Sequence, residues 1–456
     1  YGLVVVSEKD PTRIVATKES SPMVVGVGEG QNLVASDVPA LLEHTRDVIF
    51  LEEGDLAVLT AGAVELFDAS GKPVKRQVRR IDWTATMAEK GGHKHFMHKE
   101  IHEQPRALAD TLRGRVLRSE GGVHFEGFNF SQEAAKALTR VTVLACGTSW
   151  HSGLAGRWMI EALAKVPVEV ELASEFRYRD PLVSPTHLAI AISQSGETLD
   201  TLAALKEAKA RGATTLTLCN VVGSAMTREA HHTVLTNAGP EIGVASTKAF
   251  TTQLVGLYLL GIHLGRLRGT LSVAQAQEHL THLAEVPKLV EEVMKTEADV
   301  KVIAKKYLHA QDFLFLGRAT SHAVALEGAL KLKEISYIHA EGYAGGEMKH
   351  GPIALIDEKM PVVIVAPSEP KVAYEKMIGN VQEAKARGGR IVAVVDTKDE
   401  HIKTLADDVI VIPHAPALIA PIVATVPLQL LAYHVADLRG SDVDQPRNLA
   451  KSVTVE

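Results

Sequence analysis

Two hydrophobic patterns divide the chain. Up to about residue 90, short β-rich runs such as Met23–Val27, Asp47–Leu51 and Asp55–Thr60 are separated by Gly, Asp and Pro turns, which predicts an all-β region. Beyond it, apolar runs such as Val141–Cys146 and Leu188–Ser193 alternate with segments of helical periodicity. This alternation of strands and helices is typical of a doubly wound parallel sheet.

The α/β pattern occurs twice. The segment Glu207–Gly212 recurs letter for letter as Glu383–Gly388, and each copy ends a predicted helix before a β-rich strand. We therefore predict an α/β fold of two tandem doubly wound domains from an internal duplication, preceded by the β-rich region. The expected bounds are 1–90 for the β-rich domain, 91–290 for the first α/β domain with its linker, 291–440 for the second, and 441–456 for a C-terminal tail.

The loop Ser193–Thr198 has the composition of an anion site. It follows a predicted strand and precedes a helix predicted over Leu199–Arg211, whose unpaired N–H groups and positive dipole end favour negative charge. Its side-chain donors are Ser193, Gln194, Ser195 and Thr198. Since the loop lacks the Lys of a P-loop, we expect a phosphate monoester on a small metabolite. Simple capping of the helix by these hydroxyls is the alternative.

Two more hydroxyl clusters open helices in the same domain: Thr148 with Ser149, and Ser246 with Thr247. Three such clusters favour a polyhydroxylated phosphate ligand, although each alone could be a helix cap. In the second copy the loop reads Ala366–Pro370, where two prolines remove backbone donors and a glutamate adds negative charge. We therefore expect the phosphate to bind in the first α/β domain only.

Acid–base groups are concentrated in the second copy. Glu327, Lys331 and Glu334 are spaced by four and three residues on a predicted helix, so they share one face. A surface salt-bridge ladder is one interpretation, but the many apolar neighbours indicate burial, where pKa values shift to suit proton transfer. His350, in a Gly-rich loop, is a further acid–base candidate or an ordinary surface residue.

The junction Gly91–His102 contains several histidines. His95 and His98 could share a helical face and bind a metal ion, but Lys and Glu neighbours and the lack of a Cys ligand favour a solvated linker that runs into a helix. We accordingly expect no metal site, and the sequence gives no sign of a cofactor.

Composition narrows the class of protein. The net charge of −6 argues against general nucleic-acid binding, and the two cysteines, Cys146 and Cys219, are interpreted as reduced and buried, which favours a cytoplasmic location. The start at Tyr1 has no features of a signal peptide. Ala415–Ala436 contains no Asp, Glu, Lys or Arg, but prolines interrupt it, so we expect a buried core helix and no membrane partner.

Several motifs together resemble one enzyme family, the glutamine–fructose-6-phosphate aminotransferases, whose sugar-handling part consists of two sugar isomerase (SIS) domains. They are Cys146–Ser149, Ser193–Thr198, Glu241–Gln253, Glu327–His350 and Asp444–Glu456. The resemblance spans 91–456, and residues 1 to about 90 look like the second half of the family's glutaminase domain. As given, with Tyr1 and no Cys nucleophile at its start, the chain is expected to bind and isomerise the sugar but not to hydrolyse glutamine.

The resemblance also implies the reaction and the residues. A homodimer would convert fructose 6-phosphate and glutamine-derived ammonia to glucosamine 6-phosphate. Lys451 would form a Schiff base with C2 of the ketose, Glu334 would move a proton between C1 and C2 with support from Lys331, and His350, supplied by the partner subunit, would open the sugar ring. The implied substrate contacts are Thr148, Ser149, Ser193, Gln194, Ser195, Thr198, Val244, Ala245, Ser246 and Ala450.

Two other classes of function were weighed against this one. A sugar-phosphate sensor would bind without turnover, and would be expected to carry a DNA-binding domain or to lack the acid–base residues. A deglycase or plain phosphosugar isomerase would not need the tail that carries Lys451.

Overall fold

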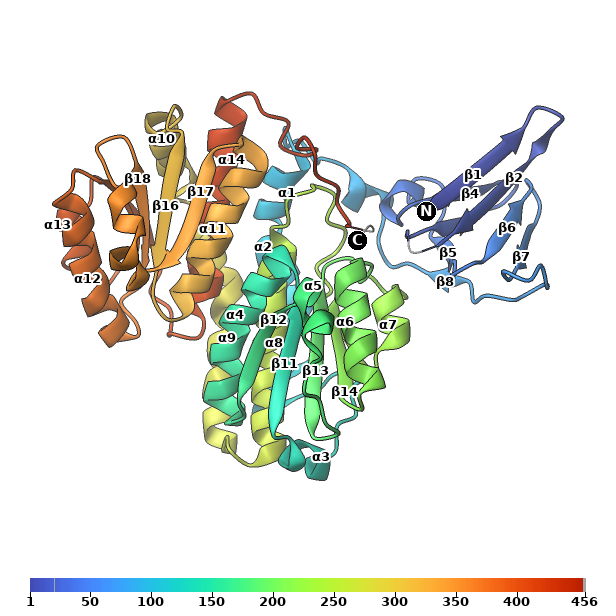
Figure 1. Cartoon of the computed structure of the whole chain (residues 1–456), viewed down its shortest axis with the longest axis horizontal. Coiled ribbons are helices and arrows are strands. Elements are labelled where there is room, and N and C mark those ends of the chain that lie inside the picture. The colour runs from blue at the N-terminus through green and yellow to red at the C-terminus, as the bar shows by residue number, and fades with distance from the viewer. Residues whose placement is uncertain (20, 454–456) are drawn as a thin grey trace.

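The computed structural model describes residues 1–19 and 21–453, which form a β-rich domain and two α/β domains (Figure 1). The two α/β domains pack against each other, and the β-rich domain lies beside the first of them. The C-terminal tail leaves the second α/β domain and crosses to the top of the first, where the described chain ends (Figure 1).

The β-rich domain contains two antiparallel four-stranded sheets, as the short alternating runs predict. One sheet has the order β1 (Gly2–Ser7), β2 (Asp10–Lys18), β6 (Leu56–Leu59) and β7 (Val64–Phe67). The other has the order β4 (Asn32–Ala35), β3 (Val24–Val27), β5 (Asp47–Phe50) and β8 (Arg79–Arg80). Alternate apolar residues of the strands, among them Ala16, Val25 and Leu59, are buried in one cluster.

Each α/β domain is built on a parallel five-stranded sheet with the same strand order. The first sheet runs β12 (Val168–Leu172), β11 (Arg140–Ala145), β13 (His187–Ser193), β14 (Thr214–Cys219) and β15 (His232–Leu235). The second runs β17 (His339–Ala344), β16 (Asp312–Gly317), β18 (Pro361–Ala366), β19 (Arg390–Asp396) and β20 (Asp408–Ile412). The predicted pair of doubly wound domains is confirmed. In this order the direction of the connections reverses between β11 and β13 in the first sheet, and between β16 and β18 in the second. In open α/β sheets, ligands bind at such a point, outside the carboxyl ends of the strands.

Helices cover both sheets. In the linker and first domain they are α1 (Phe96–His102), α2 (Gln104–Leu112), α3 (Gln132–Ala137), α4 (Gly147–Ala164), α5 (Ala173–Phe176), α6 (Leu199–Ala210), α7 (Ala225–Glu229), α8 (Lys248–Arg268) and α9 (Val273–Met294). In the second they are α10 (Glu297–Lys306), α11 (Thr320–Ser336), α12 (Lys371–Lys385), α13 (Ile402–Leu405) and α14 (Ala420–Leu438). Short 3-10 turns and the small hairpin of β9 (Val116–Leu117) and β10 (Gly122–Val123) complete the connections.

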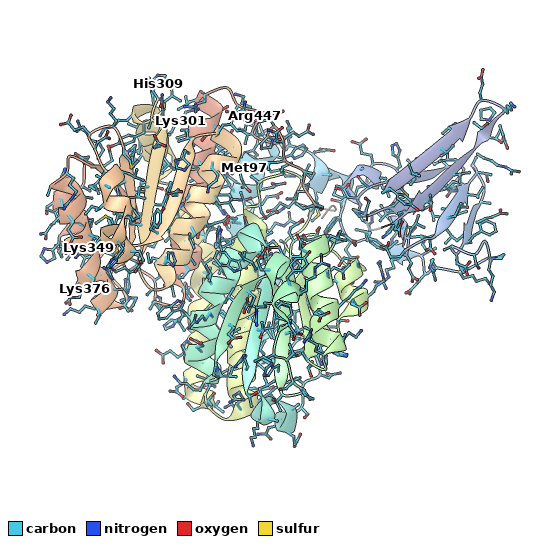
Figure 2. All side chains as sticks on the ribbon, in the orientation of Figure 1. Met97, Lys301, His309, Lys349, Lys376 and Arg447 are labelled. Atoms are coloured by element: carbon cyan, nitrogen blue, oxygen red, sulfur yellow. The ribbon has the colours of Figure 1, made fainter. Side chains whose placement is uncertain are left out.

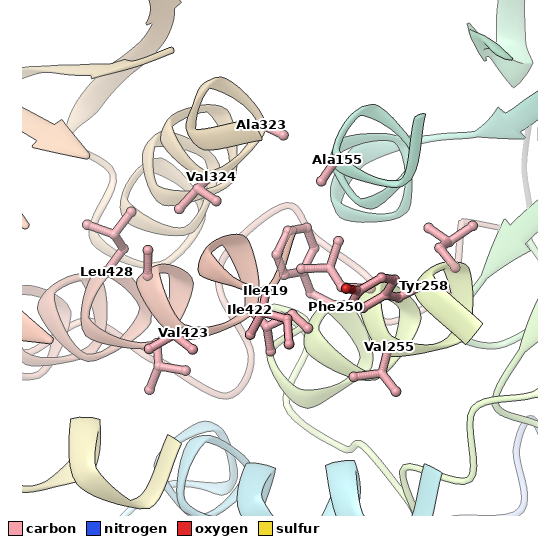
Figure 3. Close-up of a cluster of buried hydrophobic side chains, with 14 of the residues drawn as sticks. Ala155, Phe250, Val255, Tyr258, Ala323, Val324, Ile419, Ile422, Val423 and Leu428 are labelled. Atoms are coloured by element: carbon pink, nitrogen blue, oxygen red, sulfur yellow. The ribbon is translucent and has the colours of Figure 1, made fainter. Parts of the chain in front are cut away.

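One hydrophobic core runs through both α/β domains. Helices α4 and α8 of the first domain face α11 and α14 of the second, and their apolar side chains meet in a single buried cluster (Figure 3). Phe250 of α8 and Ile422 of α14 are both fully buried in it. Because apolar burial is the main favourable term in folding, this shared core fixes the position of one domain relative to the other.

Helix α14 illustrates why its sequence could be mistaken for a membrane span. It is long and apolar enough to cross a bilayer, yet 89% of its most apolar window is buried inside the protein. The expectation of a buried core helix over Ala415–Ala436 is therefore confirmed, although the helix begins later, at Ala420.

The shared core makes a prediction about stability. Replacing Ile422 by Ala should lower the free energy of unfolding by about 2–5 kcal/mol, since it leaves a cavity in the cluster. Hydrogen exchange should quicken in β11 as well as in β16. The control is Val302→Ala on α10, because Val302 is 70% exposed. It should change neither the free energy of unfolding nor the exchange rates. Faster exchange confined to β16 would show that the two domains have separate cores.

Candidate active site at the carboxyl edge of the first sheet

The loop after β13 is ordered by its own hydroxyl groups. Ser193 Oγ lies 3.1 Å from Thr198 Oγ1 and accepts a hydrogen bond from the N–H of Gly196 at 3.0 Å. Ser195 Oγ accepts from the N–H of Glu197 at 3.2 Å. Thr198 is the N-cap residue of α6, but within the described residues its side chain makes no capping hydrogen bond. Its hydroxyl is instead paired with that of Ser193, within the loop.

Gly196 is needed for the shape of this loop. Its φ of +68° lies in the left-handed region, and a Cβ here would come within 2.1 Å of Ser224 Oγ. Any other residue would strain the backbone and push against Ser224. The glycine thus allows the backbone of this loop to pass close to Ser224.

The corresponding loop of the second domain is occupied by protein groups. Both the N–H and the hydroxyl of Ser368 donate to Oδ2 of Asp396, at 3.0 and 2.7 Å. The ring of His414 lies 3.0 Å from the same carboxylate oxygen. The donors of this loop are thus already bonded to a buried carboxylate, whose negative charge disfavours a further anion here.

The predicted acid–base residues of α11 lie at the interface between the two α/β domains. Glu327 is fully buried and accepts hydrogen bonds from Thr148 Oγ1 at 3.1 Å and from the ring of His151 at 2.8 Å, both on α4. Lys331 Nζ donates to Thr148 Oγ1 at 3.0 Å and lies 2.6 Å from Glu334 Oε2. These residues therefore form buried ion pairs at a domain interface, and the alternative of a salt-bridge ladder on the surface does not apply.

The charge state of Lys331 follows from this arrangement. Burial alone would lower its pKa, but the carboxylates of Glu327 and Glu334 outweigh that effect and raise the pKa above the usual value. Lys331 therefore remains an ammonium group that holds Thr148 and Glu334 in position. Glu334 keeps part of its side chain, 22%, exposed to the cleft.

The C-terminal tail carries Lys451 into the first domain. Its ammonium group donates to Glu241 Oε2 at 2.9 Å and to the carbonyl oxygen of Gly243 at 2.8 Å. Ser246 Oγ donates to the same Glu241 oxygen at 2.7 Å. A lysine near a chain end is usually solvated, but here the buried carboxylate of Glu241 draws it to the third hydroxyl cluster.

Two buried carboxylates surround this lysine. Burial alone would raise the pKa of Glu241. The charge of Lys451 and the N–H groups of Ala249 and Thr247 outweigh this effect and hold the pKa well below its usual range. Burial and the neighbouring charge of Glu241 raise the pKa of Glu100. Glu241 is therefore the permanent negative charge that anchors Lys451.

The tail is hydrogen-bonded to the first domain beside the loop Ser193–Thr198. The N–H of Leu199, the first residue of α6, donates to the carbonyl oxygen of Val453 at 3.2 Å, and the N–H of Val244 donates to that of Asp444 at 3.0 Å. Lys451 lines a cavity that it shares with Gln194 and Ser195 and with residues of the β-rich domain. The last three residues of the tail motif, 454–456, lie outside the described residues.

The remaining predicted residues differ in how well they are placed. Ser149 accepts a hydrogen bond from Gln253 Nε2 at 3.0 Å, and Ala245 is buried beside the Glu241 loop, whereas Ala450 is exposed. His350 is exposed in the 3-10 turn Glu347–His350 of the second domain. Figure 2 shows its neighbour Lys349 on the outer side of that domain, away from the tail. The chain therefore does not bring its own His350 to Lys451.

The histidine-rich junction differs from the solvated linker that its charge suggests. Met97 and Ile101 are fully buried, so α1 is packed into the protein. His95 contacts the hydroxyl of Tyr433 at 3.1 Å, whereas the ring of His98 faces those of two other histidines, His93 and His102. The expectation of a solvated linker is wrong because α14 and α10 cover this helix, and neither is near it in the sequence.

Sequence reasoning gave no role to Glu241 and Gln253, which hold Lys451 and Ser149. Glu241 is separated from Lys451 by 210 residues, and Gln253 from Ser149 by 104. A single carboxylate or amide has no spacing pattern, so only the fold could reveal these partners.

Comparisons with known proteins agree with this architecture. The SIS domain family matches residues 135–263 and 306–438. A glutamine–fructose-6-phosphate aminotransferase (isomerizing) of Thermus thermophilus is 54% identical over 453 residues, which are 99% of this chain and 74% of that protein. The enzyme of the same name from Chlorobaculum tepidum is 49% identical over the whole of this chain, and the match again covers 74% of that protein.

Solved structures give the same result. The C-terminal domain of glucosamine-fructose-6-phosphate aminotransferase from Francisella tularensis superposes with a TM-score of 0.74 at 40% identity and covers 78% of this chain and all of its own. A glucosamine-6-phosphate deaminase from Thermotoga maritima shares the fold, with a TM-score of 0.61 at 22% identity. The match covers 78% of this chain and 99% of that protein. The chain belongs to the glutamine–fructose-6-phosphate aminotransferase family and contains its two SIS domains.

Proposed function

We propose that this protein converts fructose 6-phosphate and ammonia to glucosamine 6-phosphate, with the sugar bound between the two SIS domains. The observation that carries the proposal is the position of Lys451, an amine held by Glu241 in the cavity that Gln194 and Ser195 also line. We place the domain boundaries near 90, 290 and 440. The β-rich domain would belong to the glutaminase part that supplies ammonia in the cytoplasm.

The phosphate group is proposed to bind at the loop Ser193–Thr198. The start of α6 offers backbone N–H groups and the positive end of its dipole, and the loop hydroxyls add donors. Binding there requires Val453 to release the N–H of Leu199, so the tail would move as the sugar enters. Ser149 and Ser246, at the starts of their own helices, would contact the sugar hydroxyls.

Lys451 is proposed to act as a nucleophile on C2 of the open-chain ketose. Its Nζ, once deprotonated, forms a C=N bond to C2, and the ketone oxygen leaves as water. Ammonia then adds to C2, and Nζ leaves, so that C2 carries a primary imine and Lys451 is regenerated. Ammonia could arrive through the cavity that Lys451 shares with the β-rich domain.

Glu334 is proposed to complete the isomerisation. Its carboxylate removes a proton from C1, the electron pair forms the C1=C2 bond, and the imine nitrogen gains a proton. Return of the proton to C2 and loss of the C1 hydroxyl proton give an aldehyde at C1 and an amine at C2. The ammonium group of Lys331, 2.6 Å away, holds Glu334 in its orientation.

We further infer a homodimer, because His350 lies away from Lys451 within one chain and could open the sugar ring only in a partner's site. The two rival classes fit the structure less well. A sensor without turnover would not need the buried ion pairs of Lys331, and a plain isomerase would not need a nucleophile on the tail.

Loss of the lysine nucleophile tests the proposal most directly. Lys451→Ala should still bind fructose 6-phosphate, measured by calorimetry, but should form neither glucose 6-phosphate nor, with added ammonium, glucosamine 6-phosphate. Lys451→Arg keeps the charge beside Glu241 but cannot form an imine, and should be equally inactive. Unchanged turnover in either variant would refute the Schiff-base role.

Glu334→Gln separates imine formation from proton transfer. Turnover should fall by about 10²–10⁴-fold because the general base is lost. Borohydride should still trap the sugar on Lys451, detected as an increase in intact mass. Lys333→Gln, an exposed neighbour on α11, is the control and should keep full activity. If Glu334→Gln were as active as the parent chain, another group would be the base.

Thr198→Val tests the phosphate loop. Loss of one hydroxyl donor to a charged ligand should raise KM for fructose 6-phosphate by about 10–100-fold with little change in kcat. Ser368→Ala, in the corresponding loop of the second domain, should leave KM unchanged. The reverse pattern would place the phosphate in the second domain.

A further inference from the structure

A second polar centre lies outside the proposed active site, where the linker helix α1 meets the second SIS domain. Three histidines, His93, His98 and His102, each offer a ring nitrogen within 4.8 Å of the other two. Among the described residues they form the one group of three or more potential ligands that meets this distance. His93 and His98 line an open hollow with Glu297 and His434, and His102 contacts Glu297 Oε2 at 3.0 Å.

The helix explains how these rings come together. His98 and His102 are four residues apart and so share one face of α1, next to the face on which Met97 and Ile101 are buried (Figure 2 labels Met97). His93 precedes the helix, and its ring centroid lies 4.8 Å from that of His98. Packing of α1 against α14 therefore presents all three rings to α10.

Close approach of two ring nitrogens is the first sign of a ligand site. His93 Nδ1 and His98 Nδ1 are 3.0 Å apart. Two nitrogens bound at about 2.0–2.1 Å to a tetrahedral zinc ion are separated by roughly 3.3 Å. These nitrogens thus already have nearly the spacing of two ligands on one ion.

The hydrogen bonds around the rings fix which nitrogens could bind a metal. His98 Nε2 donates to Glu297 Oε1 at 2.8 Å, which leaves Nδ1 with its lone pair toward His93. His102 Nδ1 donates to the carbonyl oxygen of His98 at 2.9 Å, and its Nε2 lies 3.0 Å from Glu297 Oε2. A metal ion on Nε2 would therefore take the place of the proton between this nitrogen and the carboxylate. A carboxylate or carbonyl acceptor on the far nitrogen is the usual support of a metal-bound histidine.

A buried ring nitrogen without a partner is a further, independent observation. His434 on α14 has a side chain that is only 5% exposed. Its Nε2 contacts Glu297 Oε1 at 3.0 Å, whereas its Nδ1 has no hydrogen-bond partner among the described residues. Nε2 of this buried ring thus gives Glu297 a third histidine contact, beside those of His98 and His102.

We propose that His93, His98 and His102 bind a zinc ion, with Glu297 as the positioning carboxylate that orients the ring of His98 and the carbonyl oxygen of His98 as the support of His102. Three imidazoles suit Zn²⁺, and three protein ligands leave the fourth position to a water molecule in the hollow. The side chains would draw together from 4.8 Å to about 3.3 Å, a change that side-chain rotation can supply. The ion would join the linker residue His93 to helix α1, next to Glu297 of α10.

The first test is zinc binding by the full chain, purified without a histidine tag and stripped with a chelator. Equilibrium dialysis against Zn²⁺ should give one ion per chain, and Co²⁺ in its place should show the intense visible bands of a four-coordinate site. The double variant His98→Gln/His102→Gln should lose both signals. Binding at less than one ion per chain, or binding unchanged in the double variant, would overturn the proposal.

Matched variants separate the site from general effects. His95→Gln alters a neighbouring histidine outside the group and should bind zinc like the parent chain, and so should Lys451→Ala, which is confined to the active site. Glu297→Gln should weaken zinc binding by about 10–100-fold, as loss of a supporting carboxylate does. If the double variant fails to fold, His93→Gln replaces it, since His93 lies outside the helix.

Thermal unfolding gives a second readout that does not depend on activity. Zinc should raise the Tm of the parent chain and of His95→Gln, because a ligand of the folded state stabilises it, and should leave that of His98→Gln/His102→Gln unchanged. An equal rise in all three chains would mean that zinc binds elsewhere and would refute the assignment.

Discussion

The arrangement of this protein depends on the buried contact between α11 of the second SIS domain and α4 of the first. The surrounding core brings the helices together, and Glu327 and Lys331 then lie in an apolar interface that tolerates charges only when they are paired. Thr148, His151 and Glu334 provide the partners. The same contact that joins the domains therefore holds Glu327 and Lys331 against Thr148, at the start of α4.

The two SIS domains share a strand order but differ in the loop after the third strand. In the first domain this loop carries hydroxyl groups at the start of α6, whereas in the second Ser368 of the corresponding loop donates to the buried carboxylate of Asp396. The second domain instead supplies the charged face of α11. The tail then returns to the first domain, where Glu241 holds Lys451.

Local patterns were enough to predict the fold, because strand and helix periodicity, turn residues and the repeated Glu-Ala-Lys-Ala-Arg-Gly segment are all properties of neighbouring residues. They also located the hydroxyl loop, Lys331 and Glu334. They could not locate Glu241, whose partner lies 210 residues away, nor show that His98 faces His93 and His102 instead of solvent. Those contacts depend on how α1, α14 and the tail pack, which is long-range information.

A crystal structure of the chain with fructose 6-phosphate would test the central claim, that one domain holds the phosphate while its sibling and the tail supply the chemistry. The account predicts the phosphate at Ser193–Thr198, with C2 of the sugar beside Lys451 Nζ and C1 facing Glu334. A phosphate bound at Pro367–Pro370, or a sugar whose C2 lies away from Lys451, would contradict it.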